Sequence, residues 1–172
     1  MKRLILVGGP MGVGKTAACQ LLKARLPRCA FLDGDWCWDM HPFVVTDETR
    51  AMVMDNIAHL LTSFLACSEL ENIVFCWVMH EQVIIDSLLS RLPLEDCAVT
   101  SISLIAPPDV LRARLQEDVE AGLRAPDVIA RSLAYLPKYG TLDTVKIDTG
   151  AMDAQQTARE IAQLAGLALV SE

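Results

Sequence analysis

One segment of eight residues has the residue types and spacing that bind phosphate. Gly9-Pro10-Met11-Gly12-Val13-Gly14-Lys15-Thr16 matches G-x-x-x-x-G-K-[ST] in full. Glycines in this pattern let backbone N–H groups turn inward around a phosphate, and the following helix points its N-terminus at the same anion. The lysine reaches phosphate oxygens and the hydroxyl ligates Mg²⁺. The segment, with the adjoining Ala17, therefore predicts a nucleotide site for ATP and Mg²⁺, with GTP left open as the donor.

Two aspartates supply a second chemical signal. Asp33 and Asp35 directly follow a short apolar segment at residues 29–32. If that segment is a strand of a parallel sheet, both carboxylates lie at the edge that faces the ligand crevice. One of them can orient Mg²⁺ and the other can accept the proton of an attacking hydroxyl. We predict Asp35 as the general base and Asp33 beside the metal, with the two roles exchangeable; an ordinary Asp-Gly turn is the alternative.

These residues need a sheet to hold them. The fully apolar segment at residues 4–7 predicts a strand buried on both faces, and further strands are predicted at residues 29–32, 73–78, 99–106 and 145–147. Helical spacing and caps predict helices at residues 15–26, after Thr46, at 82–92, after Pro107, around 129–136 and at 153–164. Alternating strands and helices predict a three-layer α/β domain with a five-stranded parallel sheet. A helix at residues 98–106 is the alternative there, but its length and flanking prolines favour a strand.

Composition excludes several classes of protein. A chain of 172 residues suits one domain over residues 1–172, and 52% hydrophobic residues argue against disorder. No segment approaches the roughly 20 apolar residues of a membrane helix, so we expect a cytoplasmic protein without a membrane partner. A net charge of −7 disfavours nucleic acid polymers. The six cysteines form no C-x-x-C pair, which predicts reduced packing residues and no zinc site. No motif indicates the oligomeric state.

The phosphate-binding loop followed by Phe31-Leu32-Asp33-Gly34-Asp35 resembles the small P-loop metabolite kinases. The nearest families by this pattern are gluconate kinase, shikimate kinase, adenylylsulfate kinase and chloramphenicol phosphotransferase. His41-Pro42 is faintly similar to the gluconate kinase pattern, with a longer spacer. The resemblance implies transfer of the γ-phosphoryl group of ATP to a hydroxyl of a small molecule. It also implies that residues 147–149 border the adenine.

Residues 111–115 resemble the start of the lid in these kinases, whose arginines close on the ATP phosphates. The resemblance implies a mobile lid around residues 112–128, with Arg114 acting in catalysis. Asp118 stands where such lids usually have another arginine, and we expect Arg124 to take that role, because Gly122 and Pro126 predict a loop around it. The alternative is that Arg112 and Arg114 lie on a solvated helix face beside acidic residues.

The third predicted strand lacks the terminal acid of a Walker B motif. This departure argues against a motor or AAA-type hydrolase and favours transfer, with Asp33 serving the metal. The acceptor is expected beside this strand, and the candidate substrate-binding residues are Trp36, Arg50, Trp77 and His80. Packing roles are the alternatives for Trp77 and His80, and for Arg50 an ion pair with Asp47.

This aromatic, nearly neutral set of side chains favours an uncharged or aromatic hydroxyl compound over a sugar phosphate. Two other functions stay open. One is a nucleoside or nucleotide kinase that shares the donor site, and the other is a nucleotide-binding module with little catalytic activity.

Overall fold

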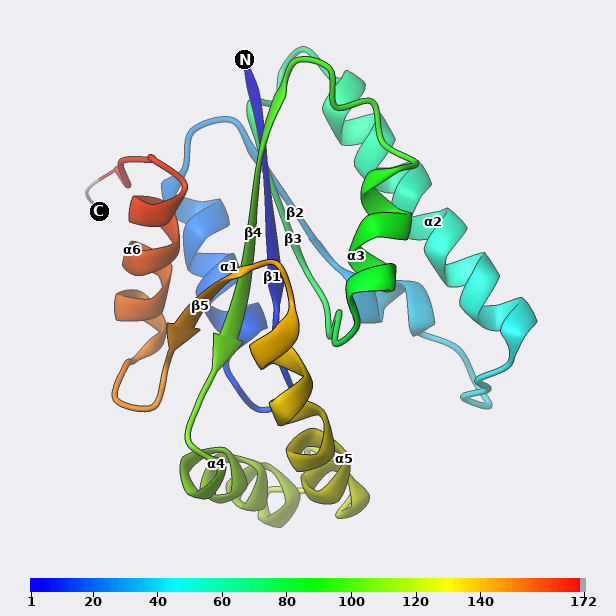
Figure 1. The fold of residues 1–172 in the computed structure, drawn as a ribbon, viewed down its shortest axis with the longest axis vertical. Coiled ribbons are helices and arrows are strands. Elements are labelled where there is room, and N and C mark those ends of the chain that lie inside the picture. Colours follow the sequence, from blue (N-terminus) through cyan, green and yellow to red (C-terminus); the bar gives the residue numbers. More distant parts are fainter. Residues whose placement is uncertain (171–172) are drawn as a thin grey trace.

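The computed structural model describes residues 1–170. Within that range the strands are β1 (Lys2–Gly8), β2 (Cys29–Asp33), β3 (Asn72–Cys76), β4 (Cys97–Ile105) and β5 (Val145–Asp148). They form one sheet in the order β2-β3-β1-β4-β5, and every pairing is parallel (Figure 1). The predicted five-stranded parallel sheet is confirmed, and the helical alternative for residues 98–106 is wrong.

Helices cover both faces of this sheet. The helices are α1 (Lys15–Arg25), α2 (Asp47–Ala66), α3 (Gln82–Leu89), α4 (Pro108–Glu120), α5 (Asp127–Tyr135) and α6 (Ala154–Leu164), with 3₁₀ turns η1 (Gly34–Trp38) and η2 (Leu136–Thr141). Strand β1 alternates between the two cores: Ile5 and Val7 pack with α1 and α6, whereas Leu4 and Leu6 pack with α2 and α3. The expected three layers therefore follow from a central strand that is apolar on both faces.

Local sequence sets the starts of two helices. Thr46 and Thr49 form a capping box at the start of α2, and Asp153 and Gln156 form another at the start of α6. The predicted third strand is two residues too long at its end, because β3 ends at Cys76 instead of residue 78. Trp77 and Val78 therefore belong to the loop after β3, at the edge of the sheet, and both line a cavity.

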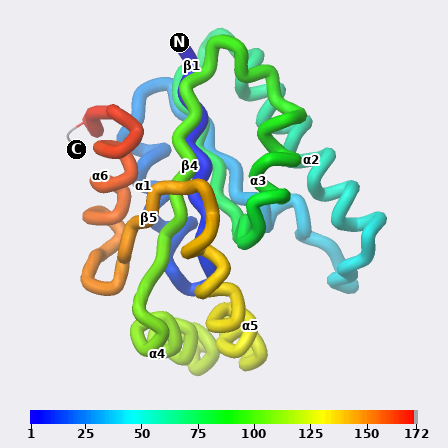
Figure 2. Tube along the Cα trace, viewed as in Figure 1, coloured from blue at the N-terminus to red at the C-terminus, as the bar shows by residue number. Residues whose placement is uncertain are grey.

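The carboxyl ends of the strands define the edge that matters for function. Helices α4 and α5 lie beyond this edge, away from the two helical layers (Figures 1 and 2). The predicted lid range, residues 112–128, covers most of α4, the turn after it and the first residues of α5. Among the helices of residues 1–170, none is long and apolar enough to cross a membrane.

Candidate nucleotide and acceptor site

The predicted phosphate-binding loop connects β1 to α1. Gly12 and Gly14 adopt φ angles of 80° and 97°, in the left-handed region that favours glycine. Lys15 begins α1, and its Nζ donates hydrogen bonds to the carbonyl oxygens of Gly9 (2.8 Å) and Pro10 (2.9 Å). The Lys15 side chain therefore lies across the loop. The loop leads directly into the N-terminus of α1, which is the arrangement that binds anions.

The two aspartates take different positions. Asp33, at the end of β2, is buried; its Oδ2 accepts from Thr16 Oγ1 at 2.7 Å and its Oδ1 accepts from the backbone N–H of Asp35 at 3.0 Å. Asp35 lies two residues further on, in η1, and its side chain lines a large cavity. The structure therefore brings Asp33 to the loop hydroxyl and Asp35 to a wall that a second substrate can reach.

The residues at the loop suit Mg²⁺. The Thr16 hydroxyl and the Asp33 carboxylate supply hard oxygen ligands within 2.7 Å of each other. Mg²⁺ keeps several waters and needs only one or two protein ligands beside the phosphates of its nucleotide. Within residues 1–170 no group of three or more His, Cys, Asp or Glu side chains gathers into a full metal cage. Thr16 and Asp33 are thus the side chains that would hold the ion.

Burial shifts the pKa values of Lys15 and Asp35. It lowers the pKa of the Lys15 amine, against the opposing influence of Cys76, Asp35 and Asp33. It also raises the pKa of the Asp35 carboxyl, an effect that Asp33 reinforces and that Lys15 and Arg124 oppose. A carboxylate with a raised pKa is a stronger base, which suits a group that must accept a proton.

The lid arginines lie in three different environments. Arg112 is exposed on α4, as the solvated alternative predicts. Arg114 instead donates from Nη2 to the Thr149 backbone oxygen (2.8 Å) and from Nη1 to Thr149 Oγ1 (3.2 Å), so it reaches the residues expected to border the adenine. Arg124 follows α4 and pairs with Asp118 at 2.9 Å, and it also lines the large cavity.

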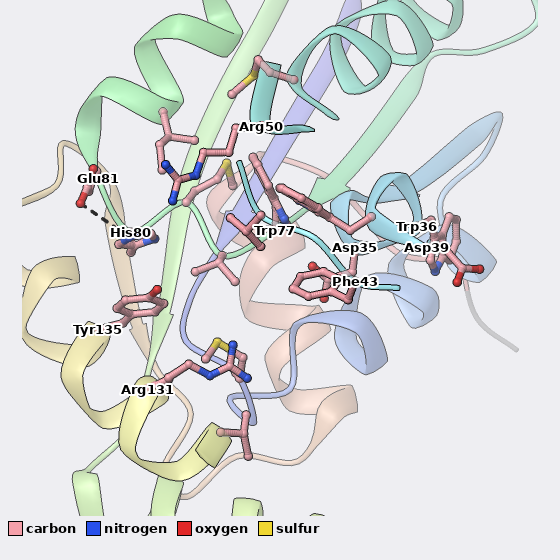
Figure 3. Close-up of a pocket in the computed structure, with 18 of the residues that line it drawn as sticks. Asp35, Trp36, Asp39, Phe43, Arg50, Trp77, His80, Glu81, Arg131 and Tyr135 are labelled. Atoms are coloured by element: carbon pink, nitrogen blue, oxygen red, sulfur yellow. Dashed lines mark ion pairs between the residues drawn. The ribbon is translucent and has the colours of Figure 1, made fainter. Parts of the chain in front are cut away.

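That cavity has a volume of about 1020 Å³ and opens beside the phosphate-binding loop, with Met11 in its wall. All four predicted substrate residues lie in its lining (Figure 3). Its aromatic rings are Trp36, Trp38, Phe43, Trp77 and Tyr135. Its charged groups, apart from His80, are Asp35, Asp39, Glu81, Arg50, Arg124 and Arg131.

Trp77 packs directly on the Asp-Gly-Asp turn. A Cβ added at Gly34 would stand 2.5 Å from Trp77 Cγ, so this turn requires glycine for the ring to approach. Trp36 makes an edge contact with Phe31, with ring centroids 5.3 Å apart, and stays half exposed. The tryptophans therefore combine the packing role and the wall role that the sequence left open.

His80 stacks on the Tyr135 ring at 4.1 Å, and its Nε2 lies 3.6 Å from Glu81 Oε1 (Figure 3). Burial lowers its pKa, so the imidazole is neutral at physiological pH. In the described part of the chain, its buried Nδ1 is without a hydrogen-bond partner. Arg50, at the far wall, pairs with Asp47 at 3.3 Å, as the alternative prediction expected, and still lines the cavity.

A smaller cavity of about 200 Å³ lies on the other side of the loop. Gly12, Gly14 and Arg114 line it together with the start of α6. The loop thus separates a small cleft beside Thr149 from the large cavity that contains Asp35. Two clefts on either side of one phosphate-binding loop can hold a nucleotide and a second substrate.

Helices α4 and α5 are fastened to the loop. Ser132 Oγ on α5 donates to the Met11 carbonyl oxygen at 2.7 Å, and Leu115 on α4 packs so closely that a Cβ on Gly12 would stand 2.6 Å from it. Below the cavity, Tyr139 Oη donates to the Val78 carbonyl oxygen at 2.6 Å. The Ser132 bond holds α5 to the loop, and the Leu115 contact holds α4 to it.

Several lining residues escaped the sequence analysis. Arg131 and Tyr135 come from α5, which the sequence assigned only by its apolar stripe, and Phe43 comes from the loop before α2. Arg131 and Tyr135 are four residues apart, so their shared helix face was the available signal. Phe43 had none, because a loop position does not reveal which way its ring turns.

A parallel sheet in this strand order, with the glycine-rich loop between β1 and α1, defines a P-loop nucleotide-binding fold. A family model described as an AAA domain matches residues 5–132, well over half of the chain, and the chain belongs to that family. The third strand still ends without an acid, so membership alone does not imply ATP hydrolysis. No curated protein matches the chain.

Solved structures share the fold at low identity. The tunicamycin resistance protein of Deinococcus radiodurans is similar over 100% of both chains, with a TM-score of 0.70 and 23% identity. A sugar kinase from Janibacter sp. HTCC2649 has a TM-score of 0.74 and 17% identity, over 98% of this chain and 96% of its own. A gluconokinase from Sinorhizobium meliloti 1021 has a TM-score of 0.68 and 21% identity, over 94% and 90%. The chain therefore has the fold of small P-loop kinases.

Proposed function

We propose that the protein is an ATP- and Mg²⁺-dependent phosphotransferase that moves the γ-phosphoryl group to a hydroxyl of a small molecule. The observation that carries this proposal is the place of Asp35, in the wall of a cavity that the phosphate-binding loop also borders. A second substrate in that cavity would lie between the Asp35 carboxylate and the phosphates. Two of the similar structures are named kinases of sugars or gluconate, which supports the same class.

The positions of the residues support the following roles. Lys15 and the loop N–H groups bind the phosphates, and Thr16 and Asp33 hold the metal, which when bound neutralises charge on the phosphate oxygens. The acceptor hydroxyl oxygen bonds to the γ-phosphorus while the bond to the β,γ-bridging oxygen breaks and ADP leaves. Asp35 accepts the hydroxyl proton. Arg114 and Arg124 stabilise the phosphates from the lid side.

The charges of the cavity favour an acceptor without a phosphate group. Among residues 1–170, the three arginines in its lining each have an aspartate partner at 2.9–3.3 Å: Arg50 with Asp47, Arg124 with Asp118 and Arg131 with Asp127. The lining also carries as many acids as arginines, and His80 is neutral. A phosphorylated acceptor would therefore meet arginines whose charge a neighbouring carboxylate already offsets. The aromatic rings instead suit an uncharged hydroxyl compound with a flat apolar group.

A nucleoside kinase is the second candidate, because nucleobases stack on rings such as Trp36 and Trp77. Both candidates share one test: ADP release from Mg·ATP with matched pairs of acceptors. Each pair joins a neutral hydroxyl compound to its phosphorylated counterpart, for example phenyl glucoside, glucose and nucleosides against their monophosphates. The proposal expects acceptor-dependent release with the neutral member of a pair. Rapid release without any acceptor would instead identify an NTPase.

Variants separate the chemistry from binding. Lys15→Ala should abolish turnover while the fold is retained. Asp35→Asn should lower kcat by about 10²–10⁴ and keep ATP affinity, since general base catalysis is worth that much. Asp39→Asn removes another carboxylate of the same cavity and should affect KM more than kcat, which makes it the matched control. Unchanged turnover in Asp35→Asn would rule out Asp35 as the base, whereas ATP binding without turnover in wild type would favour a nucleotide-binding module.

A further inference from the structure

The turn after α4 folds the lid back on itself. The backbone N–H of Leu123 donates to the Asp118 carbonyl oxygen at 2.9 Å, and Gly122 takes a left-handed φ of 71°. This turn places the Arg124 side chain over the Asp118 carboxylate, where Nε donates to Oδ2 at 2.9 Å. Asp118 thus stands where the resemblance predicted an arginine, and it contacts the arginine expected to replace it.

Arg124 also faces the reaction site. It lines the large cavity together with Asp35 and Met11. Within the described residues, the Arg124 Nη1 and Nη2 atoms make no hydrogen bond. Pairing through Nε alone sets the plane of the guanidinium and leaves two donors for a phosphate.

Stability alone does not account for this ion pair. The side chains of Arg124 and Asp118 are 41% and 34% exposed, and exposed pairs of this kind contribute little to folding. A matched pair lies on the neighbouring helix: Arg131 Nε contacts Asp127 at 3.0 Å. Arg131 lines the same cavity from α5, outside the predicted lid range of residues 112–128. The Asp118 pair is the one whose arginine lies within that range.

We propose that Asp118 is a positioning residue, which holds Arg124 by Nε so that its two free amino groups face the γ-phosphate between Lys15 and Asp35. The inference rests on the proposed function, because it assumes ATP in the loop, but it needs no acceptor. Asp118 therefore occupies a position where the resemblance predicts an arginine, and it orients the guanidinium of Arg124, six residues further along the chain.

The test compares the affinities for Mg·AMPPNP and Mg·ADP by isothermal titration calorimetry, because their ratio isolates the contribution of the γ-phosphate. Wild type should bind Mg·AMPPNP more tightly. Arg124→Ala should lower the ratio by about tenfold or more, the strength of hydrogen bonds to a charged group. Asp118→Ala should lower it by about three- to tenfold, and Asp118→Asn by less, since its amide oxygen still accepts from Nε. Asp127→Ala, the matched control, should leave the ratio unchanged.

A double-mutant cycle identifies the route of the effect. In the Arg124→Ala background, Asp118→Ala should have no further effect on the ratio. The inference is wrong if Asp118→Ala leaves the ratio unchanged, or changes it equally with and without Arg124. Circular dichroism and the melting temperature of each variant show whether the fold is intact. Failure of the proposed function is distinct: the ratio can respond as expected even if no acceptor is phosphorylated.

Discussion

Replacing Gly12 by alanine should destabilise the protein through a contact between the phosphate-binding loop and α4. Two costs arise. The φ of 80° is a left-handed conformation, which costs a residue with a side chain about 1–2 kcal/mol. The added Cβ would also stand 2.6 Å from Leu115 Cγ and Cδ2. Leu115 is fully buried, so it has little room to move, and overpacking of this kind costs about 1–3 kcal/mol.

Gly14→Ala is the matched control. Gly14 belongs to the same loop and has a φ of 97°, yet a Cβ there would meet nothing within 4 Å. It should therefore incur only the backbone cost. The two variants should differ by about 1–3 kcal/mol, which in a chain of this size corresponds to roughly 2–12 °C in melting temperature. Urea denaturation without nucleotide measures the difference directly, because ligand binding then plays no part.

A second substitution identifies the contact. Leu115→Ala alone should lower the free energy of unfolding by about 2–5 kcal/mol. The double variant Gly12→Ala/Leu115→Ala should lose about 1–3 kcal/mol less than the sum of the two single variants, because the smaller side chain leaves space for the added Cβ. Equal stabilities of Gly12→Ala and Gly14→Ala, or strict additivity in the double variant, would refute the packing of α4 on the loop.

Two further changes test the site. Asp35→Asn should raise the melting temperature at neutral pH: burial raises the folded pKa of this carboxyl above its ordinary 3.8, so its ionisation destabilises the fold as pH rises through that pKa. Melting curves should show this advantage disappearing below about pH 3, and an advantage independent of pH would contradict the electrostatic cause. Tyr139→Phe should lose the bond to the Val78 carbonyl and about 1 kcal/mol, a modest cost because that oxygen also accepts from the Gly9 N–H. A change below about 0.3 kcal/mol in urea denaturation would show that the bond adds nothing.

The features predicted best from the sequence are those set by local patterns. The phosphate-binding loop is recognised from eight consecutive residues, including its glycines and Lys15. Short apolar segments likewise predict the buried strands. Asp33 and Asp35 follow because the end of a parallel strand has a known place in the sheet. The structure places these residues in the elements that the sequence pattern predicted.

The acceptor wall was harder to predict because it is assembled from distant segments. Tyr135 reaches His80 across more than fifty residues of sequence, and no local pattern joins them. Trp77 was expected on a strand, but β3 ends at Cys76 and the ring turns onto Gly34. The partner of Arg114 was also hidden: its bonds to Thr149 replace the solvated face that nearby acids suggested.

Helix α5 has one further consequence for how the two substrates communicate. Ser132 bonds the backbone of the phosphate-binding loop, and Arg131 and Tyr135 of the same helix form part of the acceptor wall. A shift of the loop around bound phosphates would therefore also move two residues of the acceptor wall, because both belong to the helix that Ser132 ties to the loop. Such coupling is reciprocal: by whatever factor the nucleotide changes the affinity for the acceptor, the acceptor changes the affinity for the nucleotide. The domain thus has a route for cooperativity between its own two substrates without a second subunit or a separate regulatory site.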